Sequence, residues 1–261
     1  MRTTDLSELR STSHVIVGAH PDDVELIGLA AISDESASIT AVVCTDGRGG
    51  PRAPGFEDLS EPQFAALRRA EQLEAAALGG YEQLVLLEFP SVVLRENRDA
   101  VSARLHDIFS KVKPATVLTH NPADLHRTHV RTCQAVVEAL QIAGHVPAEF
   151  LGVEVWRDLD WLAPDHRVVL DVSGAEQLSM SLLSAFKSQL AGKRYDLAAA
   201  GRRRAHATFA NPYANDELSS AMLAIDLLPT LRDGQTLKEL VSHHLDEFRA
   251  ATLAALDSDP S

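Results

Sequence analysis

The sequence is poor in cysteine, in aromatic residues and in positive charge. Its 261 residues include only two cysteines, Cys44 and Cys133, which do not make a disulfide framework and fit a reducing compartment. Lys and Arg total 24 against 37 Asp and Glu, which gives a net charge of −13. This balance argues against broad binding to nucleic acids or to anionic membranes, because little positive charge is left to neutralise phosphates.

Long apolar runs are also absent. No stretch approaches the roughly 20 apolar residues of a membrane-spanning helix, and the first residues lack the apolar segment of a signal peptide. We therefore expect a cytoplasmic protein without a membrane partner. Apolar residues still make up 45% of the chain, enough for a sizeable core. No repeat, linker or shift in composition divides the sequence, so residues 1–261 are expected to form a single domain.

Short apolar runs alternate with segments of helical periodicity. The strands expected from the runs are 15–19, 38–44, 83–87, 115–119, 150–155 and 167–170. The helices expected are 24–32, 61–78, 99–112, a segment from an N-cap at Asp124 to about Leu140, 176–190, and two C-terminal helices at 216–228 and 236–256. The Arg-rich residues 198–210 are not assigned. This alternation predicts an α/β fold with a Rossmann-like, mostly parallel, doubly wound sheet and helices on both faces.

Charged side chains directly follow the first and fourth expected strands. His20, Asp22 and Asp23 come after the first, and His126 and His129 lie near the start of the helix after the fourth. The carboxyl ends of parallel strands meet at one edge, where open α/β sheets bind ligands. Crowding like charges there is costly unless a cation balances them. His20, Asp23 and His129 supply the two imidazoles and one carboxylate that are common in zinc hydrolases.

Two side chains of this group remain for catalysis. Asp22 can take a proton from water whose pKa the ion lowers. His126, one helical turn before His129, can as an imidazolium stabilise an oxyanion or protonate a leaving amine. Taken alone, each motif also fits a structural role, and it is their meeting at one edge that favours a site. The pair His243-His244 is expected to be exposed and unrelated to this metal site.

The same motifs carry a resemblance to a known family. Ala19-His-Pro-Asp-Asp23, Thr45-Asp-Gly47, Arg68-x-x-Glu71 and His120-Asn-Pro-x-Asp-x-His-x-x-His129 occur in this order. Together they resemble the PIG-L (LmbE-like) family of zinc-dependent N-deacetylases over about residues 14–191. The resemblance implies a Rossmann-like fold and removal of an acetyl group from an N-acetylglucosamine-type substrate.

By position, the resemblance also gives each clustered residue a role. His20, Asp23 and His129 match the family's zinc ligands, and the same set would accept iron(II). Asp22 matches the general base. His126 matches the histidine that stabilises the oxyanion or acts as the acid.

Substrate contacts are expected mainly from arginines. Arg68 matches an arginine on the substrate side of the family's site, and Asp46 and Arg48 lie on the long loop 45–55 at the same edge. The run 201–204 is suited to contact a phosphate of the substrate, or else to form a solvated basic face. The expected substrate is a small acetylated amino sugar, free or phosphorylated. The oligomeric state stays open, and a homo-oligomer is compatible with the sequence.

Two other classes of function fit parts of the pattern. A receiver-like signalling domain also places paired acids after its first strand to bind magnesium, although oxygen coordination has no use for His20 and His129. A catalytically silent sugar-binding or scaffold member of the same fold would keep the ligands without turnover. Metal analysis separates the first class from the hydrolase, and an assay for amine release separates the second.

Overall fold

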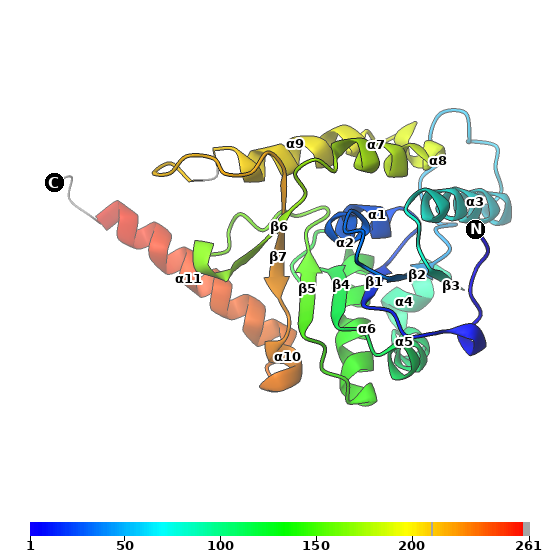
Figure 1. Cartoon of the computed structure of the whole chain (residues 1–261), viewed down its shortest axis with the longest axis horizontal. Helices are drawn as coiled ribbons and strands as arrows, with labels where there is room; N and C mark the ends of the chain where they lie inside the picture. The colour runs from blue at the N-terminus through cyan, green and yellow to red at the C-terminus, as the bar shows by residue number, and fades with distance from the viewer. Residues whose placement is uncertain (210, 258–261) are drawn as a thin grey trace.

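One seven-stranded sheet with helices on both faces organises the chain in the computed structural model, which describes residues 1–209 and 211–257 (Figure 1). The order of strands across the sheet is β3-β2-β1-β4-β5-β7-β6. In chain order the strands are β1 (His14–Gly18), β2 (Ile39–Thr45), β3 (Gln83–Phe89), β4 (Thr116–His120), β5 (Glu149–Val153), β6 (Arg167–Asp171) and β7 (Ala221–Asp226).

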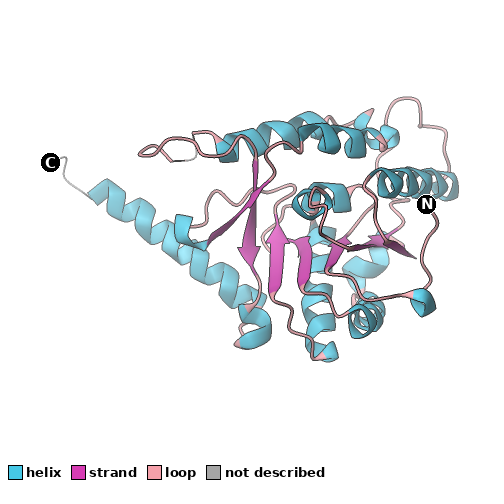
Figure 2. Cartoon of the chain, in the orientation of Figure 1, coloured by secondary structure: helices cyan, strands magenta, loops and turns pink. Residues whose placement is uncertain are grey.

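Helices make up most of the remaining chain (Figure 2). In chain order the α-helices are α1 (Asp23–Ile27), α2 (Leu29–Ile32), α3 (Glu61–Leu78), α4 (Ser91–Glu96), α5 (Asp99–Val112), α6 (Arg127–Ala143), α7 (Glu176–Ser184), α8 (Lys187–Leu190), α9 (Tyr195–Ala207), α10 (Pro229–Arg232) and α11 (Leu237–Asp257). Two short 3₁₀ helices are η1 (Leu6–Glu8) and η2 (Pro164–His166). Within the described residues, no helix combines the length and the apolarity needed to cross a membrane.

The parallel part of the sheet confirms the predicted α/β fold. β1 pairs in parallel with β2 on one side and with β4 on the other, and β3 and β5 extend the two sides. The strand order therefore reverses between β1 and β4, which is the point where open α/β sheets bind ligands. The residues that follow these two strands are the ones that the sequence marks as a candidate site.

The far end of the sheet departs from the prediction. A helix was expected over residues 216–228, but 221–226 form β7, which pairs antiparallel with both β5 and β6. The helix prediction is therefore wrong. Five of the six residues of β7 are buried. A short apolar run fits a buried strand as well as a helix, and here burial between two strands outweighs helix propensity.

Most of the other predicted helices are confirmed, with local corrections. Gly28 divides the helix expected over 24–32 into α1 and α2; a Cβ at Gly28 would lie 2.6 Å from Ile16 Cδ1, so close packing on β1 requires glycine there. The helix expected over 176–190 is divided into α7 and α8. The Arg-rich segment that was not assigned forms α9.

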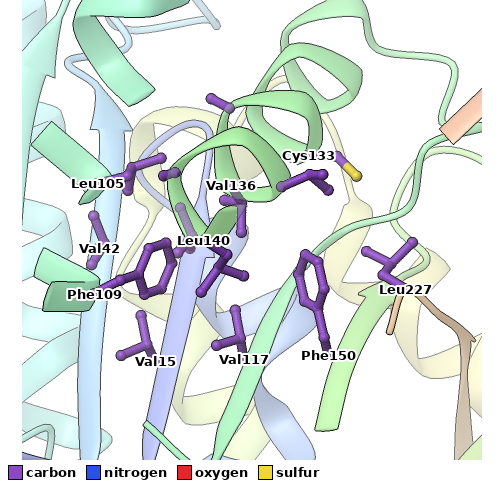
Figure 3. Packing of buried hydrophobic residues seen from close by; sticks show 14 of the residues in the cluster. Val15, Val42, Leu105, Phe109, Val117, Cys133, Val136, Leu140, Phe150 and Leu227 are labelled. Carbon is purple, nitrogen blue, oxygen red and sulfur yellow. The ribbon is translucent and has the colours of Figure 1, made fainter. Parts of the chain in front are cut away.

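The core lies on both faces of the central strands. Val15 and Val17 of β1 pack with residues of α5 and α6, whereas Ile16 packs with residues of α1 and α7. Figure 3 shows the first of these clusters, with Phe109 and Phe150 flanking Leu140 above the sheet. Since both faces are covered, side chains that leave the strands can reach open space only at an edge of the sheet. Helices α7, α8 and α9 run in one row above the carboxyl ends of the parallel strands (Figure 1).

Candidate metal centre and active site

The turn after β1 gathers the first charged residues. The backbone N–H of His20 donates to Asp23 Oδ2 at 2.7 Å. Asp22 has φ 103°, a conformation that is strained for a residue with a side chain, and its N–H donates to Gln72 Oε1 at 3.0 Å. Gly18 allows this tightness, because a Cβ there would lie 2.9 Å from the Cβ of Asp23. The turn thus holds the adjacent residues Asp22 and Asp23 in different hydrogen-bonded surroundings.

A histidine that follows the neighbouring strand β4, at the same edge of the sheet, completes a cluster around Asp23. His129 Nε2, on the first turn of α6, lies 3.3 Å from Asp23 Oδ2, and His20 Nδ1 lies 3.1 Å from the same oxygen. Asp23 and His129 are almost fully buried. The structure therefore brings the three residues that the sequence suggested as metal ligands close to one another, within two overlapping groups of possible ligands: His20, His126 and His129, and Asp23, His120 and His129.

These distances fit a metal ion. Two ligands of a tetrahedral zinc ion with bonds of about 2.0–2.1 Å lie about 3.3 Å from each other. A third imidazole, His120 at the end of β4, also lies 3.3 Å from Asp23 Oδ2, but its Nε2 accepts the N–H of Ala19 at 3.0 Å. The lone pair of that nitrogen is therefore in use, and the ring stacks on His129 at 3.8 Å between centroids. The sequence analysis did not single out His120, whose ring packs directly against that of His129.

The cluster also has the electrostatics of a cation site. Burial disfavours a charge on Asp23, but the imidazoles of His129 and His120 together outweigh it and hold the pKa of this carboxyl well below its usual value. Burial likewise opposes protonation of His129, yet Asp23 and then Asp124 raise its pKa to about 9. The position between these groups therefore favours a positive charge, whether a proton or a metal ion supplies it.

The carboxylate of Asp22 has a different environment. Arg68 Nη2 and the hydroxyl of Tyr195 both donate to Asp22 Oδ2 at 3.1 Å. Burial raises the pKa of Asp22 to about 7, against the opposing effect of Arg68. Tyr195 begins α9, far along the chain, and no signal in the sequence connects it with the first motif.

Arg68 joins three separate segments. Besides the carboxylate of Asp22, its buried guanidinium donates to the carbonyl oxygens of Pro21 and Gly47. Gly47 has φ +67°, and a Cβ there would lie 2.4 Å from Arg68 Nη1. Arg68 thus fastens the loop after β2 to the turn after β1, and glycine is needed where they meet.

His126 lies next to the cluster around Asp23, on the side that faces open space. Its ring centroid is 4.8 Å from that of His20 and 4.6 Å from that of His129. Its buried Nδ1 has no hydrogen-bond partner among the described residues. Burial, with a contribution from His129, lowers the pKa of His126 to about 4, so the ring is neutral near pH 7.

The start of α6 differs from the prediction. Asp124 was expected as the N-cap, but the helix begins at Arg127 and His126 occupies the N-cap position. Asp124 instead accepts the N–H of His126 at 2.7 Å and that of Trp156 at 3.0 Å. Its carboxylate lies 3.5 Å from His129 Nδ1, a buried nitrogen that has no hydrogen-bond partner among the described residues.

A cavity of about 680 Å³ opens onto this cluster. Its size is typical of small-molecule sites. Besides the cluster, the side chains that line it include Arg48, Arg68, Arg95, Glu154, Trp156, Gln189, Lys193, Tyr195 and Arg202. Asp46 is buried and is not among the described lining residues; its carboxylate pairs with Arg48 Nε at 2.6 Å. A substrate contact of Asp46 stays a prediction, and the structure has Asp46 orienting Arg48.

The arginine run on α9 has divided roles. Arg202 lines the cavity and donates to the carbonyl oxygen of Val155. Arg203 is buried and donates to Ser179 Oγ at 2.6 Å, which anchors α9 to α7. Arg204 is exposed. Arg203 also lines the cavity, so a phosphate contact by Arg202 or Arg203 stays a prediction, whereas Arg204 faces solvent.

Comparison with known proteins relates this site to a family. The sequence model for PIG-L, GlcNAc-PI de-N-acetylase, matches residues 15–140. The uncharacterised deacetylase YaiS of Escherichia coli is 30% identical over 146 residues, which are 53% of this chain and 71% of YaiS. The chain belongs to the PIG-L family. The PIG-L match spans the turn after β1, Arg68 and the start of α6, so it covers all of the proposed metal ligands.

Other similar proteins extend the comparison with the PIG-L family. A 1D-myo-inositol 2-acetamido-2-deoxy-α-D-glucopyranoside deacetylase of Saccharomonospora viridis is 27% identical over 194 residues, 63% of this chain and 72% of that protein. The N,N′-diacetylchitobiose deacetylase of Pyrococcus horikoshii superposes with a TM-score of 0.64 at 18% identity, covering 83% and 84% of the two chains.

The fold alone does not determine the reaction. The 4-carboxy-2-hydroxymuconate hydratase GalB of Pseudomonas putida superposes with a TM-score of 0.65 at 18% identity, covering 84% of this chain and 96% of its own. At this identity the likeness shows a shared fold and no more. The chemistry depends on the side chains around Asp22 and Asp23.

Proposed function

We propose that this protein is a metal-dependent hydrolase that removes the acetyl group from an N-acetylated amino sugar of the N-acetylglucosamine type. One observation carries the proposal. The buried carboxylate of Asp22 lies beside the cluster around Asp23, has a pKa near neutrality and lines a cavity of small-molecule size. Membership of the PIG-L family and the sugar deacetylase among its relatives support the substrate class.

His20, Asp23 and His129 would hold the ion. Their imidazole and carboxylate donors suit zinc, and they would also accept iron(II). When bound, such an ion lowers the pKa of water and polarises a carbonyl oxygen. Asp124 would keep the ring of His129 in place through its Nδ1.

Asp22 is assigned the proton transfers. Arg68 and Tyr195 both donate to its Oδ2, so Oδ1 is the oxygen that we assign to the attacking water. A base with a pKa of about 7 is suited both to accept a proton and to return it. As the water oxygen bonds to the amide carbon, Asp22 takes the proton; as the C–N bond breaks, Asp22 gives it to the leaving nitrogen. Acetate and the free amine are the products.

His126 is assigned to the developing oxyanion. Its low pKa makes it a neutral N–H donor, which can hydrogen-bond to the carbonyl oxygen as negative charge forms there. This differs from the imidazolium that the sequence suggested, and it leaves Asp22 as the acid.

The basic rim of the cavity is assigned to the rest of the substrate. Arg48, Arg95 and Lys193 lie along one cavity that also contains Trp156, whose ring lies 5.0 Å from Lys193 Nζ. An indole can pack on a sugar face, and cationic side chains can bind a phosphate. Both free and phosphorylated acetylated sugars are therefore substrates to test.

The test is an amine-release screen of acetylated amino sugars, free and 6-phosphorylated, with zinc-loaded protein. The Asp22→Asn variant is expected to keep zinc at the wild-type stoichiometry and to lose about 10²- to 10⁴-fold in kcat, the usual contribution of a general base. Full activity in this variant would remove Asp22 from the mechanism. Sugar binding without amine release would indicate a silent binding protein, and binding of magnesium but not zinc would indicate a receiver-like domain.

A further inference from the structure

A second group of histidines lies outside the cavity, where η2 meets α11. His166 ends η2, and His243, His244 and Glu247 lie within two turns of α11. None of the four is among the described residues that line the cavity. The sequence suggested that the His243-His244 pair is exposed, but the side chain of His244 is only 7% exposed and that of His243 is 55% exposed.

The four side chains converge on one point. Glu247 Oε1 lies 3.4 Å from His166 Nε2 and 3.5 Å from His243 Nε2, and Glu247 Oε2 lies 3.3 Å from His244 Nδ1. One ligand atom from each residue lies within 4.8 Å of all the others. Neighbouring ligands of a tetrahedral zinc ion lie about 3.3 Å apart, which is close to the three distances from the Glu247 carboxylate to the imidazoles.

We propose that His166, His243, His244 and Glu247 form a structural zinc site that fastens α11 to η2. Three imidazoles and a carboxylate select a zinc-like ion over magnesium or calcium, which prefer oxygen ligands. Four protein ligands complete a tetrahedral shell and leave no open position for a substrate, as is typical of structural sites.

The position of α11 explains what the ion would do. This helix extends away from the sheet in Figure 1, and of its described residues only Leu240 and His244 are buried. Little apolar contact therefore holds its middle against the rest of the molecule. An ion bound between η2 and α11 would cross-link residues far apart in the chain and would limit opening of the helix.

The test counts zinc by equilibrium dialysis and elemental analysis. His243→Gln and Glu247→Gln change exposed or half-exposed side chains and are each expected to bind one zinc ion fewer per chain than the wild type. His106→Gln is the matched control, because His106 is a partly exposed histidine on α5 whose described polar contacts are with Asp107 and Ser110 on the same helix. It is expected to bind as many ions as the wild type.

The proposal does not depend on the deacetylase activity. If the cavity held no zinc, the wild type would bind about one ion and His243→Gln about none, so the difference of one would remain. A second measurement is trypsin cleavage at Lys238 and Arg249 of α11, which zinc is expected to slow in the wild type but not in His243→Gln. Equal zinc content in the wild type and both variants, or cleavage of the wild type that zinc does not slow, would overturn the proposal.

Discussion

Replacement of Arg68 by lysine tests whether the site needs the several N–H donors of a guanidinium or only its positive charge. Arg68 donates to the Asp22 carboxylate and to the carbonyl oxygens of Pro21 and Gly47 from one buried guanidinium. Lysine keeps the charge, but its single ammonium group cannot reach all three acceptors in the same geometry.

The expected loss follows from the contacts. If the ammonium keeps the ion pair with Asp22, two buried carbonyl oxygens lose their donor. At about 1–1.5 kcal/mol for each hydrogen bond, Arg68→Lys lowers the free energy of unfolding by about 2–3 kcal/mol. The turn that carries Asp22 also loses its connection to the loop at Gly47. Because small displacements of a catalytic group are costly, kcat is expected to fall by at least about tenfold.

The assay is urea unfolding of the metal-free protein, which keeps changes in metal affinity out of the comparison. Arg69→Lys is the matched control on the same helix, since Arg69 forms an exposed ion pair with Glu88 Oε1 at 2.9 Å. Exposed pairs contribute little, so this variant is expected to stay within about 0.5 kcal/mol of the wild type. Equal stability of Arg68→Lys and Arg69→Lys would refute the reasoning.

Two glycine substitutions test the packing around the site and on α9. Gly18→Ala places a Cβ 2.9 Å from that of Asp23 and is expected to weaken zinc binding in the cavity by at least about tenfold, as measured by competition with a chelating dye; an unchanged affinity would contradict it. Gly201→Ala meets no atom within 4 Å in the middle of α9 and is expected to raise the free energy of unfolding by about 0.5–1 kcal/mol in urea titrations. A loss of stability there would mean that α9 needs a different backbone at Gly201.

The parallel half of the fold and the cluster around Asp23 could be predicted from the sequence for one reason. Parallel strands point their carboxyl ends the same way, so the residues after the first and fourth strands had to meet. This rule places His20, Asp23 and His129 at one edge, and the direct pairing of β1 with β4 makes them neighbours there. The turn that separates Asp22 from Asp23 depends further on the close approach of Gly18, which the sequence marks only as a glycine.

The remaining features depend on contacts that no local pattern carries. Tyr195 reaches Asp22 because α9 lies across the sheet edge, and nothing near Tyr195 indicates that position. The strand β7 was mistaken for a helix because its residues favour helices, and only the space between β5 and β6 makes it a strand. His120 was visible in the motif, but its role depends on the N–H of Ala19 across the sheet.

The place of β7 between β5 and β6 has a consequence for synthesis. The strand β6 pairs with β7, and β7 pairs with β5, so the chain that forms α7, α8 and α9 starts and ends at a part of the sheet that is completed late. The proposed ligands of the cavity, in contrast, have all been synthesised once residue 129 is added. A nascent chain therefore contains all of the proposed ligands while the side of the cavity that contains Tyr195 is still missing. A chain that stops before β7 would contain all of the proposed ligands but would lack the strand that joins β6 to β5.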